Sequence, residues 1–305
     1  MSGILALGAY VPERVMTNAD FEAYLDTSDE WIVTRTGIKE RRVAAEDEYT
    51  SDLAFKAVED LLRRHPGALE GVDAVIVATN TPDALFPDTA ALVQARFGLK
   101  AFAYDLLAGC PGWIYALAQA HALVEAGLAQ KVLAVGAEAL SKIIDWNDRA
   151  TAVLFGDGGG AAVVGKVREG YGFRSLVLGA AGTGATENRL YMNGREVFKF
   201  AVRVMNTATL EAIEKAGLTP EDIRLFVPHQ ANLRIIDAAR ERLGLPWERV
   251  AVNVDRYGNT STASIPLALK EAVDAGRIRE GDHVLLVSFG AGLTWAAAVL
   301  TWGGA

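Results

Sequence analysis

The chain has 305 residues, 51% of them hydrophobic, and a formal net charge of −8 at pH 7, which allows one large or two modest domains and argues against a nucleic-acid binder with a basic surface. It has no run of about 18 uninterrupted apolar residues and its first residues lack the pattern of a secretory signal, so we expect neither a membrane span nor export. The single cysteine, Cys110, excludes an internal disulfide and is typical of a reducing cytosol.

Short apolar runs alternate with amphipathic segments along the chain. The first half predicts a helix over 52–64, strands over 74–80 and 101–107, a helix over 113–126, and strands over 131–138 and 160–167. The second half predicts a helix over 202–216, a strand over 223–228, a helix over 232–243, a strand over 250–254, a helix over 265–275 and a strand over 283–290. Several strands are apolar at consecutive positions, as in strands buried on both faces, so we expect a layered α/β protein.

The two halves resemble each other. A helix, an acidic connector and VDAVIVATNTPD in the first half correspond to a helix and LTPEDIRLFVPHQAN in the second, and KVLAVGAEA corresponds to HVLLVSFGAG. We therefore expect a duplicated α/β unit made of residues 1–168 and 169–305.

Four predicted strands are followed by groups suited to chemistry. A thiol (Cys110), an imidazole (His229), a carboxamide (Asn259) and the glycine-rich turn 289–292 each follow a strand. Ligands of open α/β sheets bind beyond the carboxyl ends of strands, so these four positions are candidates for one site.

Cys110 lies in Ala-Gly-Cys-Pro-Gly, between a predicted strand and a predicted helix. Pro111 and Gly112 suit a tight turn that opens the helix, and free N–H groups at a helix N-terminus favour a thiolate. This predicts a reactive thiol, although a lone cysteine can also be an inert core residue.

Of the four histidines, only His229 follows a strand. His121 is about 16 Å along the helix from Cys110, His283 begins its strand, and His65 lies in a turn after a helix. His229 is therefore the candidate partner of the thiol. The alternatives are a structural role for His229, a turn or cap role for Asn259 and a simple turn for 289–292.

Six motifs together are highly specific, and they occur in this order: DTSDEWIVTRTGI (26–38), DLLAGCPGW (105–113), LFGDGGGAAVV (154–164), PHQANLRI (228–235), NVDRYGNTSTASIPLAL (253–269) and SFGAGLTW (288–295). With them the chain resembles, over nearly its whole length, the β-ketoacyl-[acyl carrier protein] synthase III family, the condensing enzymes that start bacterial type II fatty-acid synthesis. The resemblance implies a thiolase-like fold of two related halves with α-β-α-β-α layers, and a homodimer.

The resemblance also assigns site residues. It implies the catalytic set Cys110, His229 and Asn259, with oxyanion donors at the backbone N–H groups of Cys110 and Ala291. Many members have three glycines where this chain has Gly-Ala-Gly at 290–292. It implies a coenzyme A site made of Thr27, Trp31, Arg35, Arg149, Gly194, Phe198 and Asn232. Phe86 resembles the residue that reaches into the partner subunit's acyl pocket, and the segment 181–200 is shorter than in many members.

The implied reaction joins an acyl-coenzyme A primer to malonyl-acyl carrier protein with loss of CO₂, and it needs no metal or redox cofactor. An acidic enzyme meeting an acidic carrier protein needs a local basic face. We expect Lys199, Arg203 and Arg234 to form it, the alternative being an ordinary solvated helix face.

Three other functions stay open from the residues alone. One is a related condensing enzyme of secondary metabolism, the second a cysteine hydrolase, and the third a non-catalytic acyl-binding scaffold. The first two differ from the expected enzyme in their products, and the retention of all three polar groups with the glycine-rich turn argues against the third.

Overall fold

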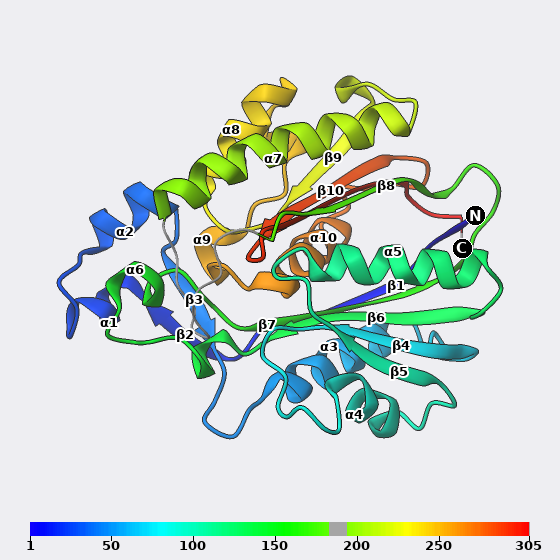
Figure 1. The fold of residues 1–305 in the computed structure, drawn as a ribbon, viewed down its shortest axis with the longest axis horizontal. Coiled ribbons are helices and arrows are strands. Elements are labelled where there is room, and N and C mark those ends of the chain that lie inside the picture. Colours follow the sequence, from blue (N-terminus) through cyan, green and yellow to red (C-terminus); the bar gives the residue numbers. More distant parts are fainter. Residues whose placement is uncertain (183–193, 305) are drawn as a thin grey trace.

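The computed structural model describes residues 1–182 and 194–304. Its two large sheets lie one above the other, with helices outside and between them (Figure 1). The first sheet has the order β1 (Ser2–Tyr10), β7 (Gly158–Lys166), β6 (Lys131–Glu138), β4 (Val72–Ala78) and β5 (Phe102–Leu106). The second has the order β8 (Gly172–Ala180), β11 (Thr294–Thr301), β10 (His283–Gly290) and β9 (Ile223–Pro228).

The helices form three layers, two outside the sheets and one between them. In Figure 1, α7 (Gly194–Lys215) and α8 (Leu233–Leu243) lie at the top, α3 (Thr50–Arg64) and α4 (Thr89–Arg96) lie at the bottom, and α5 (Gly112–Glu125) and α10 (Ser264–Asp274) lie between the sheets. The predicted α-β-α-β-α layering is confirmed. The central helices are apolar around most of their circumference, because each packs on strands of both sheets.

The remaining elements lie mostly at one end of the layers. They are β2 (Arg14–Thr17), α1 (Asn18–Glu22), α2 (Asp29–Thr36), β3 (Glu40–Val43), the short helices η1 (Leu140–Lys142), α6 (Arg149–Ala152), η2 (Pro220–Asp222), η3 (Trp247–Arg249), α9 (Val254–Tyr257) and η4 (Ser261–Ala263). None of the helices in the described part of the chain is both long and apolar enough to cross a bilayer.

The strand predicted over 250–254 is wrong. Val250 makes only an isolated bridge with Phe226, and the chain then turns into α9. The Gln230 side chain explains this, because its Oε1 accepts the N–H groups of Asn253 (2.9 Å) and Val254 (3.2 Å) in place of a neighbouring strand. Asn259 therefore follows a short helix and not a strand end. The apolar strands β1, β8 and β11 had not been predicted.

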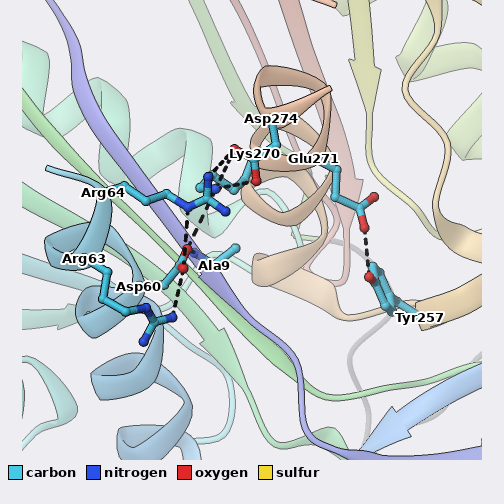
Figure 2. Close-up of polar contacts among 8 residues, drawn as sticks. All are labelled: Ala9, Asp60, Arg63, Arg64, Tyr257, Lys270, Glu271 and Asp274. Atoms are coloured by element: carbon cyan, nitrogen blue, oxygen red, sulfur yellow. Dashed lines mark hydrogen bonds and ion pairs between the residues drawn. The ribbon is translucent and has the colours of Figure 1, made fainter. Parts of the chain in front are cut away.

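A charged cluster joins the two halves of the chain (Figure 2). Lys270 of α10 is buried and bonds Asp274 at 2.6 Å, while Asp60 of α3 lies 3.8 Å from the same ammonium. Arg64 of α3 bonds Asp274 at 3.0 Å, and Asp60 also accepts the N–H of Ala9 at 3.0 Å. Each charge has a partner of opposite sign, which a buried charge requires.

Candidate active site

Cys110 lies in the turn between β5 and α5, as predicted, and it is partly exposed. The N–H groups of Cys110 and Ala291 and the side chain of Ser261 lie close enough to the sulfur to lower the pKa of its thiol. The two backbone N–H groups are those that the sequence resemblance indicated as oxyanion donors. The turn after β10 is therefore held against the N-terminal turn of α5.

The environment of the sulfur does not favour a thiolate, contrary to the expectation from the helix N-terminus. The pKa of the Cys110 thiol is raised to about 11, mainly by desolvation and also by the nearby Glu138 carboxyl. Ser261 and the two N–H groups lower the pKa of the thiol, but they do not compensate for desolvation. The position of Cys110 in the sequence could not show that the buried carboxyl of Glu138 lies nearby.

Two glycines allow the loops at the sulfur to touch. A Cβ on Gly290 would lie 2.5 Å from the Cys110 nitrogen, and a Cβ on Gly109, whose φ is +65°, would lie 2.6 Å from the Ala291 oxygen. Ala291 itself is outside the left-handed region, because Ser261 is the one non-glycine residue with positive φ in the described ranges. Alanine therefore fits at position 291, where many members of the family that the sequence resembles have glycine.

His229 follows β9 directly and is buried, and burial lowers its pKa to about 3. The imidazole is therefore neutral at physiological pH. Its Nδ1 lies 2.6 Å from the Oγ of Ser264, which also accepts the N–H of Gln230 at 3.4 Å. The ring tautomer decides the direction of this contact: with the ring proton on Nε2, Nδ1 accepts the Ser264 hydroxyl.

Asn259 is fixed by its backbone and its side chain. Its N–H donates to Leu154 (2.9 Å), its C=O accepts the N–H of Gly156 (3.0 Å), and its Oδ1 accepts the N–H of Ser261 (2.9 Å). The amide oxygen is thus engaged, which leaves the NH₂ end as the donor. Since Ser261 also lies close enough to the Cys110 sulfur to lower the pKa of the thiol, Asn259 and Cys110 share a neighbour.

A buried arginine supports the segment that pairs with Asn259. Arg41 donates to the carbonyl of Val153 (2.5 Å), to Oδ1 of Asn18 (2.8 Å) and to the carbonyl of Met16 (3.3 Å). Burial lowers the pKa of Arg41 to about 10, so it stays charged at neutral pH. Its hydrogen bonds therefore connect β2 and α1 with the turn at Val153, which precedes the segment beside Asn259.

Sequence reasoning missed Ser261 and Glu138. Glu138 ends β6 and is completely buried, and Ser261, with φ +50°, donates its hydroxyl to Glu138 Oε1 at 3.0 Å. A signal was available for Glu138, because an acidic residue closing an otherwise apolar strand is rarely fully buried without a reason. No sequence pattern indicated the backbone strain at Ser261.

The structure brings together four of the seven residues predicted for coenzyme A. The guanidinium carbons of Arg35 and Arg149 lie 4.5 and 4.8 Å from the Trp31 ring, and Asn232 donates to the Arg35 carbonyl at 2.9 Å. The buried Oγ1 of Thr27 has no hydrogen-bond partner in the described ranges. Gly194 and Phe198 lie instead on α7, where Phe198 is 5.5 Å from the Arg234 guanidinium.

The remaining predicted residues lie on the surface. Lys199, Arg203 and Arg234 are exposed, with Lys199 bonded to Glu196 at 2.9 Å and Arg203 lying 5.9 Å from the Phe200 ring. Phe86 is 90% exposed in the single chain. Of the shortened segment 181–200, residues 183–193 lie outside the described part of the structure.

Comparison with known proteins gives concordant results. A model described as 3-oxoacyl-[acyl-carrier-protein (ACP)] synthase III matches residues 104–182, and the corresponding C-terminal model matches 213–302. A β-ketoacyl-[acyl-carrier-protein] synthase III from Deinococcus deserti is 55% identical over 99% of this chain and 91% of its own length. Among solved structures, the synthase III of Thermus thermophilus is 93% identical with a TM-score of 0.98, covering 99% of this chain and 100% of that one. That of Aquifex aeolicus is 46% identical with a TM-score of 0.96 and the same coverage.

Proposed function

The chain belongs to the 3-oxoacyl-[acyl-carrier-protein] synthase III family, and we propose that Cys110, His229 and Asn259 perform its chemistry at one site. It is a condensing acyltransferase, which joins an acyl-coenzyme A primer to malonyl-acyl carrier protein and so starts fatty-acid synthesis. The observation that carries our assignment is the turn after β10: Gly290 lies against the Cys110 backbone, and the ring of Phe289 next to it lies 5.4 Å from the ring of the neutral His229.

In the first half-reaction, the Cys110 sulfur attacks the thioester carbon of the primer. The carbonyl oxygen becomes an oxyanion, which the N–H groups of Cys110 and Ala291 stabilise, an effect of about 3–4 kcal/mol per donor in other enzymes. The bond from the carbonyl carbon to the coenzyme A sulfur then breaks. An acyl-cysteine remains, and coenzyme A leaves.

In the second half-reaction, malonyl-acyl carrier protein loses CO₂. The electron pair of the broken carbon–carbon bond forms an enolate, whose oxygen accepts hydrogen bonds from His229 Nε2–H and the Asn259 NH₂ group. A carboxylate in place of Asn259 would repel that oxygen. The carbanion attacks the acyl-cysteine and releases the thiol. Because the electron pair stays on the substrate, we propose that no metal or redox cofactor takes part.

Product analysis tests the proposal. The purified protein is incubated with malonyl-acyl carrier protein and acetyl-, propionyl- or branched acyl-coenzyme A, and the products are identified by mass spectrometry. We expect β-ketoacyl-acyl carrier protein, with the primer panel giving the preferred chain length. Release of free acid without any condensed product would instead support the cysteine hydrolase.

Removing either side chain of the Trp31–Arg149 pair should weaken primer binding. An adenine stacked between them needs a gap of roughly 7 Å, two van der Waals contacts of about 3.5 Å, so the 4.8 Å pair must open around the base. We expect Trp31→Ala and Arg149→Ala to raise the KM for acyl-coenzyme A about tenfold or more, since a cation–π contact contributes about 1–2 kcal/mol.

The matched control is Arg168→Ala, because Arg168 lies 4.9 Å from the Tyr171 ring in a similar but distant pair. Its KM values should equal those of the wild type. A fall in kcat alone in the Trp31 and Arg149 variants, at unchanged primer KM, would argue against a coenzyme A site there.

Reversing the charge of Arg234 should impair the second half-reaction selectively. Arg234, Arg203 and Lys199 place exposed cations on the adjacent helices α7 and α8, where an acidic carrier protein can dock. We expect Arg234→Glu to raise the KM for malonyl-acyl carrier protein several-fold, and to leave transfer from acetyl-coenzyme A to Cys110 nearly unchanged. Steady-state assays of each half-reaction measure this.

Arg242→Glu is the matched control, since Arg242 is exposed and lies eight residues further along α8. It changes the net charge equally, about 12 Å away along the helix axis. If both variants weaken carrier-protein use equally, net charge and not a local docking face is responsible.

We also propose that the enzyme works as a homodimer in a reducing compartment such as the cytoplasm. The edge strand β5 has no partner on one side among the described residues, and Leu85, Phe86 and Leu107 are 80%, 90% and 76% exposed. A second copy would cover this edge and these side chains. Sedimentation equilibrium tests this, and a chain that stays monomeric at micromolar concentration contradicts it.

A further inference from the structure

The orientation of the Asn259 carboxamide depends on a single hydrogen bond among the described residues. Its Oδ1 accepts the N–H of Ser261 at 2.9 Å, and Asn259 is 9% exposed. A backbone N–H can only donate, so the amide atom that faces it must be the oxygen, and the NH₂ group must point the other way. The direction of the Ser261 N–H therefore decides where the amide donor of the proposed site points.

Ser261 presents this N–H from an uncommon backbone conformation. Its φ of +50° lies in the left-handed region, where a serine is strained. The chain that follows is fixed in η4 and then in α10, which packs on β1 and β7. A return of this φ to negative values would therefore turn the peptide between Thr260 and Ser261, and the N–H with it. Keeping the amide oriented requires a group that holds Ser261 in place.

The buried carboxyl of Glu138 holds the Ser261 side chain. Glu138 is 0% exposed, and its Oε1 accepts the hydroxyls of Ser261 at 3.0 Å and Thr262 at 3.3 Å. The Nδ2 of Asn80 donates both to this oxygen and to the Ser261 Oγ. The described partners of this carboxyl are all neutral, and a buried carboxyl without a cation is costly, so its retention calls for a role.

The strand β6 brings the carboxyl to Ser261. A Cβ on Gly136 would lie 2.6 Å from the carbonyl oxygen of Thr262, so η4 packs directly against the strand at this glycine. Residues two apart on a strand face the same side, so Glu138 points toward η4 as well. The glycine allows the close approach, and the carboxyl two residues later supplies the hydrogen bonds.

We propose that Glu138 is a positioning residue for the decarboxylation step. Its hydrogen bond with the Ser261 hydroxyl keeps Ser261 in the left-handed region, and the Ser261 N–H then keeps the Asn259 NH₂ group turned toward the enolate oxygen. Glu138 itself neither contacts the substrate nor exchanges a proton. The inference rests on the proposed role of Asn259 and concerns only the second half-reaction.

Two substitutions of Ser261 separate its backbone conformation from its hydroxyl. Both remove the hydroxyl, but only glycine accepts a positive φ without strain. We expect Ser261→Ala to release CO₂ from labelled malonyl-acyl carrier protein about 10–10² times more slowly than the wild type, at an unchanged KM, because alanine strongly disfavours this conformation. Ser261→Gly should stay within about threefold of the wild type. Acylation of Cys110 should be equal in the two variants, since both lack the hydroxyl.

Substitutions of Glu138 test the carboxyl itself. Glu138→Leu removes the acceptor and should slow CO₂ release as much as Ser261→Ala does, whereas Glu138→Gln keeps an oxygen for the Ser261 hydroxyl and should stay near the wild-type rate. Adding Ser261→Gly to Glu138→Leu should recover most of the CO₂ release, because glycine no longer needs the carboxyl. The matched control is Thr262→Val, since Thr262 also donates to Glu138 but has no described hydrogen bond with Asn259. It should behave as the wild type.

The outcomes are distinguishable. If Ser261→Gly is as slow as Ser261→Ala, or if the double variant does not recover, the inference is wrong while Asn259 keeps its proposed role. If Asn259→Ala releases CO₂ at the wild-type rate, that role fails and the inference fails with it. Thermal unfolding monitors the fold of each variant. Should Glu138→Leu not fold, Glu138→Asp takes its place, because its carboxyl is one carbon shorter and withdrawn from Ser261.

Discussion

Replacing Cys110 with alanine should abolish acyl-enzyme formation while decarboxylation of malonyl-acyl carrier protein continues. Acyl transfer needs the sulfur as the atom that forms the new bond, and no other described side chain occupies its place between the two N–H donors. The enolate needs only the donors at His229 and Asn259, which this substitution leaves in place. The half-reactions should therefore separate completely.

Two measurements on the same samples check this. Intact-protein mass spectrometry after incubation with acetyl-coenzyme A reports the acyl-enzyme, with peptide mapping to locate it in the wild type. Release of CO₂ from labelled malonyl-acyl carrier protein reports decarboxylation. Acylation of Cys110→Ala at a serine or lysine with continued condensation would show that Cys110 is not the nucleophile.

Asn259→Ala should give the opposite result: CO₂ release about 10²–10³ times lower, with acylation of Cys110 largely intact. The reason is the position of the amide, whose oxygen accepts the Ser261 N–H and whose NH₂ end is left to donate to the enolate oxygen. Loss of one preorganised donor corresponds to about 2.7–4 kcal/mol of transition-state stabilisation. The alanine backbone can keep both hydrogen bonds to the 154–156 segment, so the fold should survive.

His229→Ala provides the companion measurement, and it too should block CO₂ release. Because burial lowers the pKa of His229 to about 3, the imidazole gains a proton only at strongly acidic pH. Wild-type CO₂ release should therefore show no step at the usual imidazole pKa of about 6.5. Normal decarboxylation by Asn259→Ala, together with loss of acylation, would contradict this division of roles and favour the hydrolase.

The backbone N–H groups at Cys110 and Ala291 belong to two closely packed loops. Gly290 brings the Ala291 N–H to the sulfur because any Cβ at that position would lie 2.5 Å from the Cys110 nitrogen. Ser261, which begins η4, lies near the same sulfur. Residues from the first and the second half of the chain therefore meet at Cys110.

The sequence by itself determined the layered fold and the place of Cys110 and His229. Runs of apolar residues predicted β6, β9 and β10 with the bounds that the structure has, because local periodicity reports burial on one or both faces. A cysteine before Pro-Gly at a helix start, and a histidine directly after a buried strand, are local features too. They required no knowledge of distant contacts.

Only the tertiary structure decided the electrostatics of the site. Glu138 lies in β6 and Cys110 follows β5, and no periodicity links the two residues, yet desolvation of the sulfur and the Glu138 carboxyl reverse the expected effect of the helix N-terminus on the thiol. Likewise, the Gln230 side chain accepts the N–H groups of Asn253 and Val254, and the chain forms a short helix before Asn259 where a strand was expected. Protonation depends on burial and on neighbours brought together from distant parts of the chain, whereas secondary structure depends largely on residues close in sequence.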